Sequence, residues 1–274
     1  MKDYLPKEHF DAEAERSSPG EGENPGKFSF HSFPPWSRCP QWWDFIEKDM
    51  KVLDIGSGIG TEVGKLNQRK VFAVGCDVAP KMIELAKKNC LAHGVDSAKF
   101  VLWDGINLPF QAGSFHRITT NTVLQHVVDD SKLENIFSQV NRVLIPGGLF
   151  LISEIVGVKT SHVYSHVKVR TRKDYIYMAG KKGFTLIANK KQAKLYLSLN
   201  YAFCLLRLFS RRWLAGKKDV PGPATRQQED KKSNPLAFKR RLDKFCQRID
   251  HVLDKMHFFP LLVTQDSMVF KKEG

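Results

Sequence analysis

The stretch between residues 52 and 77 constrains the fold most, because a glycine-rich turn joins two apolar segments there. Val52–Ile55 predicts a short buried strand that stops at the first of three alternating glycines, Gly56, Gly58 and Gly60. Asp77 ends the second apolar segment, 17 residues after Gly60. Glycines at such a turn let the backbone approach a ligand, and an acid after the second strand can accept hydrogen bonds from both ribose hydroxyls. The pattern predicts an adenosine-binding site.

The turn also bears on the kind of cofactor. A nicotinamide-binding loop usually reads G-x-G-x-x-G and places a pyrophosphate at a helix N-terminus. Here the third glycine comes one residue early, and Asp54 precedes the first glycine by two residues. A carboxylate at that strand end is unfavourable beside a pyrophosphate and suits a cofactor that carries a sulfonium and an ammonium group.

These residues resemble the D-x-G-x-G-x-G signature of class I S-adenosylmethionine (SAM)-dependent methyltransferases. The similarity continues, in order, through five segments: Asp54–Gly60, Gly75–Met82, Leu102–Phe110, Phe115–Val127 and Arg142–Gly148. One departure is His116-Arg117, where the family usually has an aspartate after the aromatic residue. The resemblance implies SAM as the cofactor and S-adenosylhomocysteine (SAH) as the product.

The resemblance also implies roles for individual residues. Asp54 would lie beneath the ammonium end of the cofactor, Asp77 would bind the ribose, and Asp104 with Gly105 would read the adenine edge. The full set of implied cofactor-binding residues is Asp54, Gly56, Ser57, Gly58, Gly60, Asp77, Val78, Met82, Asp104, Gly105, Asn121 and Gln125.

The rest of the chain alternates apolar strands with helix-like segments, which predicts an α/β fold. We expect a doubly wound, mostly parallel seven-stranded sheet with helices on both faces, an antiparallel last strand and a helical insertion before it. The expected organisation is an N-terminal arm and lead-in helix at 1–44, a SAM-binding core at 45–189, a basic helical insertion at 190–258 and a final core strand at 259–274. The acidic residues 1–27 are expected to pack loosely.

Methyl transfer requires alignment of a nucleophile and, for a hydroxyl acceptor, a general base. His126, which follows the fourth predicted strand, is the best-placed base, although a locally bonded structural histidine is an alternative. The candidates to face the substrate are His31, Glu154, His162, Tyr164 and His166. No metal site is predicted, because the five cysteines are scattered and none forms a C-x-x-C pair.

Charge is distributed unevenly along the chain. Residues 1–150 hold 17 Lys and Arg against 19 Asp and Glu, whereas residues 151–274 hold 26 against 10. Within the second half, residues 190–218 combine basic residues with apolar ones at helical spacing. This is typical of a lid over a substrate pocket, and peripheral contact with an anionic membrane is an alternative.

The favoured function is methyl transfer to an O or N acceptor on a small molecule or glycan. A membrane-bound or lipid-linked acceptor is the main alternative. RNA is less favoured as the acceptor. Base-methylating enzymes often carry the motif Asn/Asp-Pro-Pro-Tyr/Phe after the fourth strand, whereas this chain has Asn121-Thr122-Val123-Leu124 there. A non-enzymatic binding module is least favoured, because the glycine turn is intact. Without an apolar leader at residue 1, we expect a cytoplasmic protein, with attachment to the inner face of a membrane as the alternative.

Overall fold

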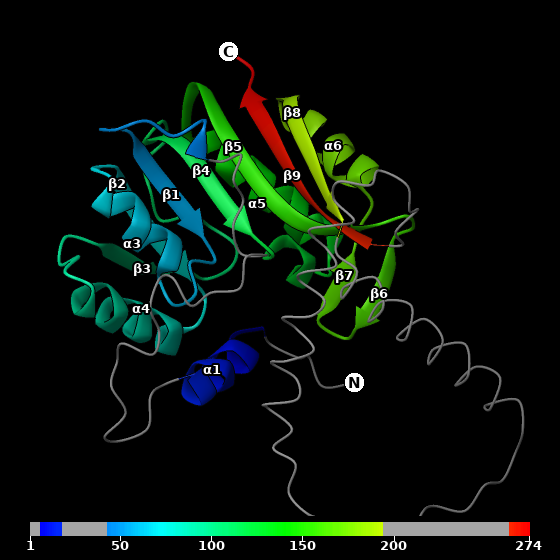
Figure 1. Ribbon diagram of the computed structural model, residues 1–274. Coiled ribbons are helices and arrows are strands. Elements are labelled where there is room, and N and C mark those ends of the chain that lie inside the picture. Colours follow the sequence, from blue (N-terminus) through cyan, green and yellow to red (C-terminus); the bar gives the residue numbers. More distant parts are fainter. Residues whose placement is uncertain (1–5, 18–42, 194–262) are drawn as a thin grey trace, which may run out of the picture. The chain divides into compact units, whose positions relative to one another are not determined.

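The computed structural model describes residues 6–17, 43–193 and 263–274 of the 274-residue chain. The predicted lead-in segment around His31 and most of the predicted insertion at 190–258 lie outside the described residues. Figure 1 shows the described part as one twisted sheet with helices packed against it. Among the described residues, no helix is long and apolar enough to cross a membrane.

The sheet has seven strands in the order β3-β2-β1-β4-β5-β9-β8. Their bounds are β1 Lys51–Ile55, β2 Phe72–Asp77, β3 Lys99–Leu102, β4 Phe115–Asn121, β5 Leu144–Gly157, β8 Phe184–Ala193 and β9 Val263–Lys272. The five strands from β3 to β5 pair in parallel, and β9 runs in the opposite direction (Figure 1). The predicted mostly parallel sheet with an antiparallel last strand is confirmed. The chain steps outward from β1 to β3 and returns to β4, so the topological switch point lies between β1 and β4.

Helices cover both faces of the sheet. They are α3 Thr61–Gln68, α4 Pro80–Ala92, α5 Asp130–Val143 and α6 Arg172–Gly180. Successive strand residues point to opposite faces, so Val52 packs with residues of α3 and α4, whereas Leu53 packs with residues of α5 and α6. The predicted doubly wound architecture follows from this alternation of buried strand residues.

Two of these helices begin where local chemistry favours a helix start. Pro80 occupies the first turn of α4, where its missing N–H costs nothing. Asp129 precedes α5, and its side chain accepts hydrogen bonds from the backbone N–H groups of Ser131 and Lys132. Pro80 follows the end of β2 by three residues and Asp130 follows the end of β4 by nine, so both helix starts lie near the carboxyl end of the sheet.

The N-terminal segment forms a helix, α1 Pro6–Ser17, that packs against α4. Asp11 Oδ1 accepts a hydrogen bond from the backbone N–H of Lys81 at 3.1 Å, and Glu15 forms an ion pair with the Lys81 side chain. Ala14 is buried against Ala79 and Met82. The predicted loose packing of the arm is therefore wrong for residues 6–17, because apolar and charged contacts with α4 hold the helix.

A small antiparallel pair lies between β5 and α6. It consists of β6 Ser161–Tyr164 and β7 Val167–Val169, in a segment expected to be a loop. Gly157 donates its backbone N–H to the carbonyl of Arg170 at 3.0 Å, which ties the end of this pair to β5. The turn between β6 and β7 carries His166 toward the edge of the sheet where the strands end.

Candidate active site

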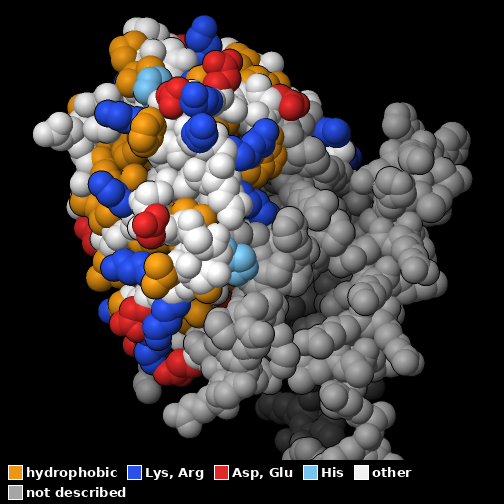
Figure 2. All heavy atoms as spheres, turned by 60° about the vertical axis from the view of Figure 1, so that its left-hand side comes forward, with side chains coloured by type: hydrophobic (Ala, Val, Ile, Leu, Met, Phe, Trp, Pro, Cys, Tyr) orange, Lys and Arg blue, Asp and Glu red, His pale blue; other side chains and the backbone are white. Residues whose placement is uncertain are grey.

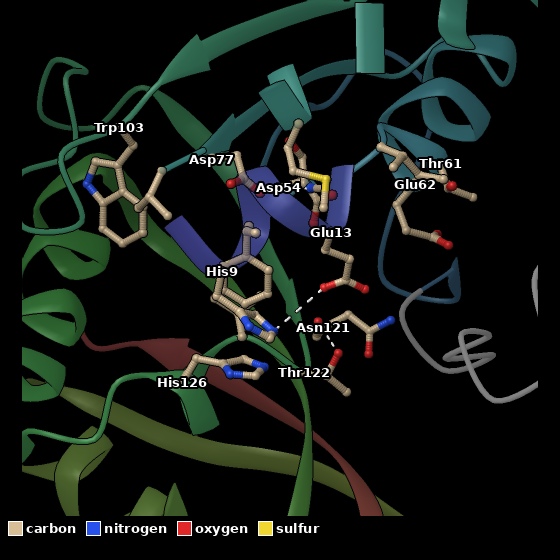
Figure 3. A pocket seen from close by; sticks show the side chains of 18 residues that line it. His9, Glu13, Asp54, Thr61, Glu62, Asp77, Trp103, Asn121, Thr122 and His126 are labelled. Carbon is tan, nitrogen blue, oxygen red and sulfur yellow. Dashed lines mark hydrogen bonds and ion pairs between the residues drawn. The ribbon is translucent and has the colours of Figure 1, made fainter. Parts of the chain in front are cut away.

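A cavity of about 550 Å³ lies at the carboxyl ends of β1, β2 and β4. This volume is within the range of small-molecule sites, and the switch point of a doubly wound sheet is where such sites occur. Figure 3 shows the labelled lining side chains converging from the sheet and from α1. The lining residues are His9, Phe10, Glu13, Asp54, Gly56, Ser57, Gly58, Ile59, Thr61, Glu62, Asp77, Val78, Met82, Trp103, Asn121, Thr122, Val123 and His126.

The glycine loop between β1 and α3 forms the floor of this cavity. The backbone N–H groups of Gly56 and Ser57 donate to the carbonyl of Cys76 at 2.8 and 3.0 Å. Gly56 has a φ of 68°, and a Cβ atom there would lie 2.4 Å from a methyl carbon of Val123. A Cβ at Gly60 would lie 2.8 Å from the ring of Phe100, so Gly60 serves the packing of α3 and does not line the cavity.

Asp77 projects from the end of β2 into the cavity (Figure 3). One carboxylate oxygen accepts the backbone N–H of Ala79 at 3.0 Å, and the other accepts that of Gly58 at 2.9 Å. Burial raises the pKa of Asp77, and these N–H donors oppose the shift. A carboxylate has about four acceptor positions, so each oxygen keeps capacity for a further hydrogen bond from a ligand.

Asp54 lies in β1 on the same side of the cavity. It is buried, and Thr119 Oγ1 donates a hydrogen bond to its carboxylate at 2.7 Å. Burial raises the pKa of Asp54 to about 7, with the nearby Glu62 and Asp77 acting in the same direction. A cationic ligand group in the cavity would favour the ionised form of this carboxyl group.

His126 is placed at the cavity by a short helical turn, η3 Leu124–His126. Its Nδ1 lies 3.3 Å from the carbonyl oxygen of His166, and its Nε2 lies 3.3 Å from Gln125 Nε2. Burial lowers the pKa of His126 to about 4, so the imidazole is neutral at pH 7. A neutral imidazole beside a ligand cavity can accept a proton.

Sequence reasoning missed the contribution of α1. His9, Phe10 and Glu13 line the cavity, the Phe10 ring meets the His126 ring edge-on at 5.1 Å, and the His9 and His166 rings lie 4.6 Å apart. His9 and Glu13 lie one helical turn apart on α1, with His9 Nε2 4.0 Å from a carboxylate oxygen of Glu13 (Figure 3). Within this segment, the only sequence pattern that indicated a helix with an apolar face was the four-residue spacing of Phe10 and Ala14.

Several residues predicted to bind the cofactor do not line the cavity. Asp104 is exposed, and one of its oxygens accepts the backbone N–H groups of Ile106 and Asn107 at 2.7 Å each, which closes its own turn. The neighbouring Trp103 lines the cavity instead. Like Asp104, Gly60, Gly105 and Gln125 lie outside the lining.

The structure also separates the residues expected to face the substrate. Glu154 is fully buried beneath η3 and accepts only backbone N–H groups there. His162 is exposed on β6, Tyr164 ends that strand, and His166 stacks on His126. His31 lies outside the described residues. In the described ranges, no group of three or more His, Cys, Asp or Glu side chains is arranged to hold a metal ion.

Asn121 meets the last strand at the edge of the cavity. Gln265 of β9 donates from Nε2 to Asn121 Oδ1 at 3.3 Å and to Ser153 Oγ at 2.8 Å. This bond ties the side chain of Asn121, which lines the cavity, to β9. Gln265 was not among the predicted site residues, because its partner lies 144 residues away in the sequence.

Comparison with known proteins agrees with this geometry. Residues 52–148 match the family model described as a methyltransferase domain. An uncharacterized methyltransferase of Synechocystis sp. is 36% identical over 110 residues, which cover 40% of this chain and 49% of that protein. A demethylmenaquinone methyltransferase of Thermus thermophilus is 32% identical over 112 residues, with coverages of 40% and 49%. The chain thus spans about half the length of these curated relatives.

Solved structures show the same fold. A sarcosine dimethylglycine methyltransferase from Galdieria sulphuraria superposes with a TM-score of 0.56 and 15% identity, covering 83% of this chain and 80% of that one. Phosphoethanolamine N-methyltransferase 2 of Haemonchus contortus gives 0.56 and 16%, covering 86% and 52%. Residues 52–148 are thus similar to a methyltransferase domain, and the described residues share the fold of these solved methyltransferases.

Proposed function

We propose that the protein transfers a methyl group from SAM to an oxygen or nitrogen atom of a small-molecule or glycan acceptor. The observation that carries this proposal is the pairing of Asp77 with the glycine loop, because the Asp77 carboxylate both fixes Gly58 and faces the cavity. The names of the relatives support a small acceptor: one is a demethylmenaquinone methyltransferase, and one structural neighbour is bound to phosphomonomethylethanolamine.

The described residues fit SAM chemically. The Asp77 carboxylate has acceptor capacity for a ribose diol, and the buried Asp54 suits a cationic group. Val78, Met82 and Trp103 offer an apolar wall for a purine ring. SAM supplies an electrophilic methyl group on a positively charged sulfur. His126, neutral at pH 7, can take the proton that the acceptor loses, and α1 shields this place from water.

The charge of the lining favours nitrogen over oxygen as the acceptor atom. Its carboxyl groups are Glu13, Asp54, Glu62 and Asp77, and among the described residues no Lys or Arg lines the cavity. A cleft with one sign of charge attracts ligands of the opposite sign. Two of these carboxyl groups are assigned to the cofactor, so Glu13 and Glu62 remain to attract a basic amine.

Binding and transfer test this function separately. Isothermal titration of SAM and SAH into the full chain should show saturable binding at one site. Methyl transfer from radiolabelled SAM is then measured with matched acceptors that carry an amine, a hydroxyl or a phosphate group. Absence of SAM and SAH binding would contradict the methyltransferase function, whereas binding with transfer only to hydroxyl acceptors would contradict the preference for nitrogen.

A membrane-bound or lipid-linked acceptor is the second candidate, and charge motivates it. Residues 194–262 contain 15 Lys and Arg against 6 Asp and Glu. On the face of the described part drawn in Figure 2, basic side chains are interspersed with acidic and apolar ones. We propose residues 190–258 as the acceptor-binding cap and residues 190–218 as its membrane-facing part. Co-sedimentation with anionic but not neutral vesicles would support the second candidate, and equal recovery with both would count against it.

A further inference from the structure

A buried carboxylate, Glu154 of β5, holds the turn that carries His126. Glu154 Oε1 accepts the backbone N–H groups of Val123 and Leu124, both at 2.9 Å, and Oε2 accepts that of Gln125 at 3.3 Å. The side chain is 0% exposed. Burial raises the pKa of Glu154 to about 7, and the three N–H groups favour its ionised form, in which their bonds are charge-assisted. Three hydrogen bonds that converge on one buried side chain fix the backbone of the turn.

A buried guanidinium, Arg170, holds the carbonyl side of the same turn. Its Nη1 donates to the carbonyl of Leu124 at 3.2 Å, and its Nη2 donates to that of Val127 at 2.7 Å. Asp130 accepts two further bonds from Arg170, at 3.1 and 2.7 Å, and so balances its charge. The turn is thus bonded through its N–H groups to a carboxylate and through its C=O groups to a guanidinium.

The backbone beside the turn is strained, which indicates that its position is imposed. Thr122 has a φ of 56°, and this left-handed conformation is rare and unfavourable for a β-branched residue. Its N–H donates to the carbonyl of Ser153 at 2.7 Å. Strain of this kind persists only where the surrounding contacts outweigh it.

The turn also touches the glycine loop directly. The Val123 side chain packs so closely on Gly56 that a Cβ atom there would overlap it. Thr122, Val123 and His126 all line the cavity. A displacement of the turn would therefore move the proposed base and the wall of the glycine loop together.

We infer that Glu154 and Arg170 are positioning residues that lock the turn Thr122–Val127 against the glycine loop and so shape the site for cofactor and acceptor. Neither residue touches the cavity, and both act through the backbone of the turn. This inference rests on the proposed function, since it describes how the same site is held.

The test compares Glu154→Leu, which loses all three bonds, with Glu154→Gln, whose amide oxygen can still accept from Val123 and Leu124. We expect SAH affinity to fall by about 10-fold in Glu154→Leu, equal to about 1.4 kcal/mol, and by less in Glu154→Gln. Amide hydrogen exchange should become faster at residues 123–125 in both variants without faster exchange in β1 or β4. Glu84→Gln, at an exposed position of α4, is the matched control and should change neither quantity.

Each outcome has a defined meaning. Faster exchange confined to the turn together with weaker SAH binding supports the positioning role, and Glu154→Gln alone suffices if Glu154→Leu does not fold. Unchanged SAH affinity in folded Glu154→Gln with faster exchange at Gln125 would overturn it, as would a uniform loss of protection throughout the sheet. A wild-type protein that fails to bind SAH contradicts the methyltransferase function itself, which differs from a loss confined to the variants.

Discussion

The imidazole rings of His126 and His166 lie nearly parallel, with their centroids 5.8 Å apart and 5° between their planes. Burial lowers the pKa of both rings, that of His126 to about 4. The stack therefore consists of neutral rings at pH 7. A proton on His126 would place an unsolvated positive charge beside His166 and His9, which also face it.

The first prediction follows from the lowered pKa of His126. The unfolded chain binds a proton at about pH 6.5 and the folded chain only at about pH 4, so the unfolded state gains protons between these values. The free energy of unfolding should therefore decrease as the pH falls from about 6.5 to about 4, by up to about 3 kcal/mol from this residue. His126→Gln should reduce that slope. NMR titration of the imidazole checks it directly, and a pKa of 6.5 or above would contradict the prediction.

A second prediction concerns Asp77. Its carboxylate can accept two charge-assisted bonds from a ribose diol, each worth roughly 1.5–3 kcal/mol, so Asp77→Ala, which removes both, should weaken SAM binding by about 100-fold to 10,000-fold. Asp77→Asn should lose less, because an amide oxygen still accepts. Asp96→Ala, on an exposed turn before β3, is the control. Titration calorimetry measures the affinity, with circular dichroism to confirm folding. Near-wild-type affinity of folded Asp77→Ala would remove Asp77 from the site.

A third prediction separates strain from steric overlap in the glycine loop. Gly56 and Gly113 both have positive φ, 68° and 62°, but only Gly56 faces a close neighbour. Gly113→Ala should cost about 1–2 kcal/mol of unfolding free energy, from backbone conformation alone. Gly56→Ala should cost more and should weaken SAH binding, and adding Val123→Ala should restore part of the stability. Urea unfolding gives these values. Equal losses for the two single variants would show that the close contact has no energetic consequence.

A fourth prediction concerns the pH dependence of cofactor binding. Burial raises the pKa of Asp54 to about 7, so the carboxyl group is largely protonated at pH 6 in the empty site. A sulfonium and an ammonium favour its ionised form, so SAM affinity should rise with pH up to about 7 and then level off, by at most about tenfold per pH unit. Asp54→Asn should remove this dependence. Calorimetry between pH 5 and 8 tests it, and a dissociation constant that does not vary over that interval would contradict it.

The carboxyl group of Asp54 changes the free energy of unfolding with pH in the opposite direction to His126. The pKa of Asp54 is higher in the folded protein than its unfolded value of 3.8. Its contribution to the free energy of unfolding is therefore fully present below about pH 4 and is lost as the pH rises through about 7. Bound SAM should reverse that loss, because it stabilises the ionised form.

A fifth prediction concerns α1. The Phe10 ring contacts His126 and packs with Ala14, Ala79 and Met82, so it closes one side of the cavity. Phe10→Ala should speed SAH dissociation by about tenfold, because the loss of a partly buried aromatic contact of about 1.4 kcal/mol acts mainly on the off-rate. Phe72→Ala, which removes a largely exposed ring from the start of β2, is the control. Stopped-flow fluorescence measures the rates, and equal off-rates would show that α1 does not hold the ligand.

The strands and the glycine loop could be predicted because their signals are local. An apolar run that ends at Gly56, and an acid at the end of the next strand, are properties of neighbouring residues, and the structure places Asp54 and Asp77 at the cavity as expected. The alternation of strands with helices predicted the mostly parallel, doubly wound sheet, and the structure added the order of its strands.

The rest of the site depends on contacts between distant segments. Glu13 reaches the cavity only because α1 packs on α4, and no pattern within α1 indicates that partner. Asp104 follows β3 as the family pattern implies, yet its carboxylate bonds to its own turn and faces solvent. Glu154 stands near a strand end, where a substrate-facing side chain was expected, but η3 covers it, and its burial cannot be foreseen from its place in the sequence.

The position of β9 between β5 and β8 has a consequence for biosynthesis. β8 leaves the ribosome 69 residues before β9 begins, and until then its inner edge and that of β5 have no strand between them. Open strand edges pair readily with other chains, and pairing between segments far apart in sequence is slow. The nascent protein therefore passes through a stage in which five of the seven strands can pair and the edges of β5 and β8 are exposed. Binding of a chaperone during translation would protect it at that stage.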